Sequence, residues 1–141
     1  MKTQLFISAL IASGSIGAMP FAQAGELTVT ISDIRNPKGT IMVAVEKSDT
    51  GWNDQEKPVA AQKLPASGKE VVLKFDLPAG EYAVQVMHDE NDNGKLDTNF
   101  MGMPIEGYGF SNNPQVMRKA HFDEAKFALG EAAASIVVRL R

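Results

Sequence analysis

Residues 71–88 have the sequence VVLKFDLPAGEYAVQVMH. Apolar side chains recur at every second position on both sides of a Pro-Ala-Gly turn at residues 78–80. Successive side chains of a β-strand point to opposite faces, so this period of two predicts two half-buried strands joined by a tight connection. The residues expected to face the core are Val71, Leu73, Phe75 and Leu77 in the first strand, and Tyr82, Val84, Val86 and His88 in the second.

The same alternation recurs on both sides of this stretch. It predicts further strands at 27–32, 41–45, 59–64, 125–129 and 136–140, separated by turn residues. The first two of these are expected to pair as a hairpin, and one turn of helix is expected at 114–119. Together the segments predict an all-β protein, a single antiparallel β-sandwich of about seven strands with one long loop. Its predicted core includes Val29, Val43, Leu73, Phe75, Val84, Ile136 and Val138.

The N-terminus has the three parts of a secretory signal. Lys2 supplies the positive charge, residues 5–19 are apolar, and Ala22-Gln23-Ala24 places small residues where a signal peptidase cleaves. We therefore expect residues 1–24 to be a signal peptide and residues 25–141 to be one β-sandwich domain in the periplasm of a Gram-negative bacterium, or secreted. The alternative is a retained membrane anchor, but the apolar run is short and interrupted by Gly14, Gly17 and Pro20. After removal of the signal, no membrane insertion is expected.

The amino-acid composition and the absence of common motifs exclude several classes of function. The chain has no Cys, which excludes disulfides and attachment of a lipid to a Cys behind the signal. Removing Lys2 with the signal takes the formal charge from −3 to −4, and no basic patch is visible, so nucleic acid is not an expected partner. None of the common catalytic motifs occurs, and the protein is not expected to be an enzyme.

The segment from Asp89 to Asp97, DENDNGKLD, alternates oxygen-bearing side chains with a glycine at its sixth position. Calcium takes six to eight oxygen ligands, and this spacing matches the first nine positions of an EF-hand loop. The predicted ligands are the side chains of Asp89, Asn91, Asn93 and Asp97 and the carbonyl of Lys95. The alternative is that these residues only form a turn, because Asp, Asn and Gly all favour turns.

The predicted calcium loop departs from an EF-hand at its twelfth position. That position holds Phe100 instead of the bidentate Glu, and no helix is expected before Asp89. Glu106 or a water would complete the shell. With few carboxylates, the expected dissociation constant is roughly 10⁻⁴ to 10⁻³ M.

The rest of the long loop, residues 99–113, mixes aromatic residues with glycines. It is either a binding lip or an ordered loop that packs on its own side chains. The candidate lip residues are Phe100, Tyr108, Phe110 and Asn112.

Two readings of function remain open. The first is a binding or interaction module with a calcium-binding loop, whose protein or small-molecule partner is unknown. The second is a metal carrier for copper, or a small hydrolase, that uses the 88–113 loop. The copper alternative depends on His88, His121 and four methionines (Met87, Met101, Met103 and Met117), because imidazole and thioether groups suit Cu(I).

The run HDENDNGKLDTNFMGMPIEGYGFSNN at 88–113 resembles the signature of a bacterial secreted family, the domain of unknown function 2141. The layout of the whole mature chain resembles it too. The resemblance implies a signal-bearing, periplasmic protein and implies no reaction.

A looser similarity lies in Leu77-Pro78-Ala79-Gly80-Glu81-Tyr82. This segment is similar to a turn in prealbumin-like and carboxypeptidase-regulatory-like sandwiches, which implies an Ig-like or prealbumin-like arrangement of strands. One relative of those folds hydrolyses 5-hydroxyisourate and ends in a Tyr-Arg-Gly-Ser/Thr tail. This chain ends in Val137-Val138-Arg139-Leu140-Arg141, which excludes that activity.

Overall fold

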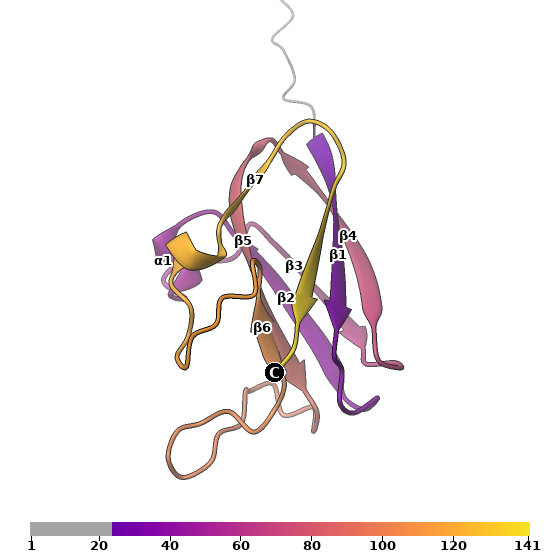
Figure 1. The fold of residues 1–141 in the computed structure, drawn as a ribbon, viewed down its shortest axis with the longest axis vertical. Coiled ribbons are helices and arrows are strands. Elements are labelled where there is room, and N and C mark those ends of the chain that lie inside the picture. The colour runs from indigo at the N-terminus through magenta and orange to yellow at the C-terminus, as the bar shows by residue number, and fades with distance from the viewer. Residues whose placement is uncertain (1–23) are drawn as a thin grey trace, which may run out of the picture.

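The computed structural model describes residues 24–141 (Figure 1). The predicted signal peptide therefore lies outside the described residues, except for Ala24. The elements in chain order are β1 (Ala24–Ser32), β2 (Thr40–Glu46), α1 (Asp49–Trp52), β3 (Ala60–Pro65), β4 (Val71–Pro78), β5 (Gly80–Asp89), β6 (Tyr108–Phe110), α2 (Phe122–Ala125), β7 (Phe127–Leu129) and β8 (Ala134–Arg139). No helix among them is long and apolar enough to cross a membrane.

The strands form two sheets, and the all-β prediction is confirmed. One sheet has the order β4-β1-β8, and the other has the order β3-β2-β5-β6 with β7 also paired to β5. All seven predicted strands are present, but Ala125, predicted to begin the sixth, lies in α2. The structure adds β6, which lies within the segment predicted to be a long loop. Tyr-Gly-Phe is too short to establish a period of two, so this strand has no signal in the sequence.

Two details of the predicted pairing are wrong. Strands β1 and β2 do not form a hairpin, because they lie in different sheets. The connection between them crosses the sandwich, and the amide of its buried Ile34 donates to the carbonyl of Lys69 at 3.1 Å. The sandwich is also not wholly antiparallel, since β8 runs parallel to β1 with Val29 opposite Ile136.

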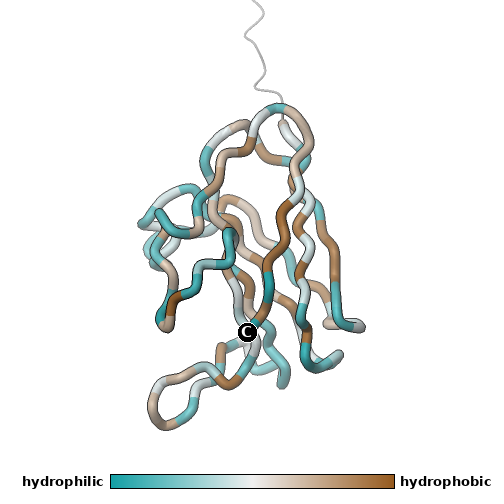
Figure 2. Tube along the Cα trace, in the orientation of Figure 1, coloured by the Kyte–Doolittle hydropathy of each residue, from teal (hydrophilic) through white to brown (hydrophobic). Residues whose placement is uncertain are grey.

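The main core lies between the two sheets. Its predicted members Val29, Val43, Leu73, Phe75, Val84 and Val138 are buried, and Ile136 is partly buried against them. Brown and pale segments alternate along the strands in Figure 2, as expected for strands with one face on the core. The phase predicted from residues 71–88 is therefore confirmed.

A second, smaller core lies on the opposite face of the five-stranded sheet. Its members are Trp52, Ala83, Phe110, Ala120, Phe122 and Ala125. The indole nitrogen of Trp52 donates to the carbonyl of Ala120 at 2.7 Å, and its ring lies 5.6 Å from that of Phe110. This cluster covers one end of the outer sheet face and leaves the other end uncovered.

The helical turn predicted at 114–119 is wrong, and the helices occur at α1 and α2 instead. The carbonyls of Pro114 and Val116 accept hydrogen bonds from the guanidinium of Arg141 and do not form a helical turn. Helix α2 begins after His121, whose amide donates to the carboxylate of Glu124 at 2.7 Å. A capping arrangement that starts from His is not the usual sequence signal, which has Ser or Thr.

Candidate functional site

The acidic loop, residues 89–97, begins where β5 ends. Along β5, inward-facing Val84, Val86 and His88 alternate with outward-facing residues, and Asp89 follows in the outward set. Asp89 is only 3% exposed. Its two carboxylate oxygens accept hydrogen bonds from the amides of Asn93 (3.1 Å) and Gly94 (2.7 Å). Asp89 thus bends the chain around its own side chain.

Asp97 gathers the other predicted ligands. The amide side chain of Asn91 donates to Asp97 Oδ2 at 2.6 Å, and that of Asn93 donates to both carboxylate oxygens at 2.8 and 2.9 Å. The side-chain oxygen Oδ1 of Asn93 accepts from the backbone amide of Lys95 at 2.9 Å. The structure therefore brings the five predicted ligand residues into one compact loop.

Calcium binding requires that the loop offer enough oxygen ligands. Among the described residues, no group of three or more His, Cys, Asp or Glu side chains is placed to hold a metal ion. A cation here would rely on the carboxylates of Asp89 and Asp97 together with amide oxygens. The side-chain amides of Asn91 and Asn93 present nitrogen to Asp97, and their oxygens accept from the backbone amides of Asn93 and Lys95. Rotation by half a turn would present oxygen to a cation beside Asp97 and would break those two hydrogen bonds. The donor set fits calcium in chemical type.

Glu106 holds the two ends of this loop together. It is 4% exposed, its Oε1 accepts from the amide of Glu90 at 2.9 Å, and its Oε2 accepts from the amide of Asp97 at 2.9 Å. Its role as an additional calcium ligand stays a prediction. The observed contacts give it a structural role that the sequence analysis did not anticipate.

Residues 98–104 form a short finger beyond the acidic loop (Figure 1, below β6). Thr98 and Pro104 form a bridge, and the amide of Asn99 donates to the carbonyl of Met103 at 2.8 Å. The side chain of Asn99 accepts from the amides of Met101 and Met103. At its tip, Phe100 is 98% exposed and Met101 is 73% exposed. The finger is thus closed by its own hydrogen bonds and presents apolar side chains.

The predicted binding lip is not one surface. Phe100 lies at the tip of the finger, and Phe110 is buried in the smaller core. Asn112 adopts a positive φ of 65°, and its amide donates to the carbonyls of Glu124 and Lys126. Tyr108 faces a groove on the outer sheet face. Phe110 also lines this groove, with its ring 5.8 Å from that of Tyr108. The structure therefore brings Tyr108 and Phe110 together and places Phe100 and Asn112 elsewhere.

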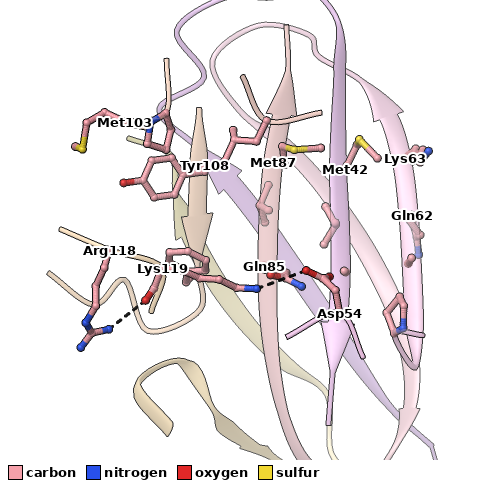
Figure 3. A pocket seen from close by; sticks show the side chains of 18 of the residues that line it. Met42, Asp54, Gln62, Lys63, Gln85, Met87, Met103, Tyr108, Arg118 and Lys119 are labelled. Carbon is pink, nitrogen blue, oxygen red and sulfur yellow. Dashed lines mark hydrogen bonds and ion pairs between the residues drawn. The ribbon is translucent and has the colours of Figure 1, made fainter. Parts of the chain in front are cut away.

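That groove has a volume of about 620 Å³ (Figure 3). Its floor is the uncovered end of the five-stranded sheet, where Met42 and Ala44 of β2 lie beside Gln85 and Met87 of β5. Residues 102–104 of the finger form one wall, and residues 117–119 line another side. The finger therefore follows the acidic loop in the chain and also forms a wall of the groove.

The sequence analysis did not predict this groove, although the outward residues of two strands indicate an uncharged surface. The outward residues of β4 include Lys74 and Asp76, as expected for a solvated face. The outward residues of β2 and β5 that line the groove carry no charge. Four of the five methionines in residues 25–141 also line the groove: Met42, Met87, Met103 and Met117.

Charged groups lie around the groove. Arg118 forms two hydrogen bonds with Glu124, at 2.7 and 2.9 Å, which lower the pKa of that carboxyl to about 2. Lys119 donates to the carbonyl of Trp52, and its amino group lies 4.0 Å from Asp54.

One further acidic residue lies outside the groove. Burial raises the pKa of Glu46, which lies against α1.

The histidines are not in this groove. His88 faces inward, as predicted, and its Nε2 lies 2.7 Å from the carbonyl of Lys38. His121 is the residue before α2. The mixed imidazole and thioether set of the copper alternative is therefore not assembled here.

Comparison with known families gives one match. Residues 29–137 match the family DUF2141, described as "Uncharacterized protein conserved in bacteria". No curated protein and no solved structure matches the chain.

Proposed function

We propose that this chain, which belongs to the DUF2141 family, is an exported binding module that holds an apolar ligand in the groove of its five-stranded sheet. In this proposal residues 1–24 direct export to the periplasm. Residues 25–141 form a sandwich of the Ig-like or prealbumin-like kind. The observation that carries the proposal is an apolar hollow on a sheet face that the smaller core leaves uncovered.

The lining of the groove supports binding of a small molecule. Its volume of about 620 Å³ lies in the range of ligand pockets, roughly 300–1,000 Å³. Ligand pockets are mostly apolar with a few polar groups that orient the ligand, and here Gln85 lies among methionines and alanines. Thioether side chains are flexible and polarisable, so they adapt to the shape of an apolar ligand.

We also propose that calcium bound by Asp89, Asn91, Asn93, the Lys95 carbonyl and Asp97 stiffens one wall of this groove. Glu106 joins the amide of Asp97 to that of Glu90, and the finger starts at the next residue, Thr98. An ion that fixed Asp97 would therefore fix the base of the finger. The expected affinity stays weak, because the loop offers few carboxylates.

A second candidate, a carrier of Cu(I), is favoured by one observation. Four thioether side chains line the same groove, and thioethers are soft ligands that select Cu(I). The test is titration with Cu(I) under reducing conditions. Stoichiometric binding that Met42→Leu and Met87→Leu weaken would support the carrier function over the apolar-ligand function. The hydrolase alternative stays a prediction from sequence.

The binding proposal is tested with N-phenyl-1-naphthylamine, an uncharged fluorescent probe of apolar sites. The native protein is expected to enhance its fluorescence saturably, with one probe bound per chain. Ala44→Trp places a large ring on the groove floor and should abolish this signal. Val72→Trp places the same ring on an exposed position of β4 and is the matched control. The absence of saturable binding, or equal binding by Ala44→Trp, would contradict the proposal.

A further inference from the structure

The floor of the groove contains a continuous row of four side chains, one from each of the strands β3, β2, β5 and β6. The register pairs Lys63 of β3 with Met42 of β2, Met42 with Met87 of β5, and Met87 with Tyr108 of β6. Residues directly opposite each other in neighbouring strands share one face of the sheet. Figure 3 shows this row from Lys63 at the right, across the two methionines, to Tyr108 at the left.

The next row lies beside it and has small residues on β3 and β2. Ala61, Ala44, Gln85 and Phe110 are paired in the same way across the four strands. The alanines leave space above the sheet face, and all four residues line the groove. With strands about 4.8 Å apart, a row of four spans roughly 14 Å. The groove therefore suits a narrow, extended ligand that lies across the strands.

Cations lie at both ends of the row, but they differ in their partners. At the Tyr108 end, the guanidinium of Arg141 lies 5.5 Å from the ring centroid and donates to the carbonyls of Pro114 and Val116. The other end carries Lys63. Ionisable side chains that line the groove are Lys63, Arg118, Lys119 and Asp54, three cations and one anion, although the chain as a whole has a net charge of −3. Arg118 is held by Glu124, and Lys119 is held by the Trp52 carbonyl with Asp54 nearby. In the described part of the chain, no ion pair involves Lys63.

We propose that the groove binds a linear amphiphile with one anionic group, a fatty acid carboxylate, with its head at Lys63 and its chain over Met42 and Met87 toward Tyr108. This inference rests on the proposed function, because it assigns the ligand class of the same groove. Charge complementarity selects the anion. The lysine stem adds apolar surface beside Met42 and leaves its amino group at the water-exposed edge of the sheet.

The experiment measures displacement of N-phenyl-1-naphthylamine by three amphiphiles of equal chain length, each below its micelle concentration or solubility limit: dodecanoate, dodecyltrimethylammonium and dodecanol. Dodecanoate is expected to displace the probe at lower concentration than the other two. Lys63→Met keeps an apolar side chain and removes the charge, so it should weaken dodecanoate roughly threefold to fivefold, the effect of one exposed ion pair. Binding of the uncharged probe should not change. Lys69→Met, an exposed lysine outside the groove, is the matched control.

The outcomes separate this inference from the proposal on which it rests. Probe binding that Ala44→Trp abolishes, with equal displacement by all three amphiphiles, would overturn the anionic ligand and leave the apolar groove in place. A preference for dodecanoate that Lys63→Met does not reduce would overturn the assignment of the head to Lys63. If neither the probe nor dodecanoate binds the native protein, both proposals fail.

Discussion

Glu106 and Asp97 are joined by a hydrogen bond of 2.9 Å from the amide of Asp97 to the carboxylate of Glu106, a residue that is 4% exposed. The other oxygen of Glu106 accepts from the amide of Glu90 at the opposite end of the loop. One side chain therefore satisfies two backbone amides and closes the acidic loop at its base. The finger begins at the residue after Asp97 and forms one wall of the groove, so this closure fixes the position of its base.

Glu106→Gln is expected to destabilise the protein. The amide keeps one acceptor oxygen but turns an NH₂ group toward the amide of either Glu90 or Asp97, which leaves a buried donor without an acceptor. Such a loss costs about 1–3 kcal/mol. Urea unfolding of residues 25–141 measures the change, and Glu131→Gln, on an exposed turn, is the control. Equal loss in both variants would contradict the role given to Glu106.

The inner face of the sandwich could be predicted from the sequence, because burial of a strand face depends on residues within that strand. Val71 to Leu77 show this directly, since their alternation matches the observed burial along β4. The same holds for His88, which continues the inward phase of β5. The acidic loop was also predictable, because its spacing is local.

The uncharged outward residues of β2 and β5 can be recognised in the sequence, but the groove that they line was not predictable, because it depends on register between strands. Lys63 and Met42 are neighbours only because β3 pairs with β2 as it does, and no local pattern sets that alignment. The same is true of Met87 and Tyr108, since β6 is too short to be recognised. The hairpin predicted for β1 and β2 was wrong for a related reason. Turn residues are compatible with a connection between sheets as well as with a hairpin.

Leu73→Ala is expected to cost about 2–5 kcal/mol, through lost burial and the cavity that remains. Leu73 lies in the main core and pairs with Val29 across β1 and β4. Val72→Ala, at the neighbouring exposed position, should change the free energy of unfolding by less than about 0.5 kcal/mol. Chemical denaturation of both variants tests which face of β4 lies on the core. A larger loss of stability in Val72→Ala than in Leu73→Ala would reverse this assignment.

Tyr82→Phe is expected to cost about 0.5–1.5 kcal/mol, the usual worth of one hydrogen bond. The hydroxyl of Tyr82 donates to the carbonyl of Pro78 at 2.7 Å and so fixes the turn between β4 and β5. The ring itself is buried, and Phe retains it. Thermal unfolding measures the change. A melting temperature equal to that of the native protein would mean that the hydroxyl contributes nothing to the turn.

Glu46→Gln is expected to stabilise the protein at neutral pH. Burial raises the folded pKa of Glu46 above its ordinary value of 4.5, so the folded state resists ionisation more than the unfolded state does. Stability is therefore lost as pH rises from about 4.5 through the folded pKa, and Gln, which cannot ionise, avoids this loss. Urea unfolding at pH 4 and pH 7 should give a benefit only at pH 7. Glu70→Gln, an exposed residue, should give none, and a benefit of Glu46→Gln at pH 4 alone would contradict the sign.

Calcium is expected to raise the melting temperature, because an ion held by the 89–97 loop binds the folded chain and not the unfolded one. The stabilisation is RT ln(1 + [L]/Kd), or about 2.7 kcal/mol at a hundredfold excess over Kd, which is several degrees for a domain of this size. Magnesium should do less, since it demands a tight octahedron and retains its water. Asp97→Asn keeps the shape of the side chain that binds Asn91 and Asn93, removes its charge, and should abolish most of the shift. Asp76→Asn, on the exposed face of β4, makes the same change outside the loop and should leave the shift intact. Identical melting curves in millimolar calcium and in chelator would mean that the loop is held by its own hydrogen bonds alone.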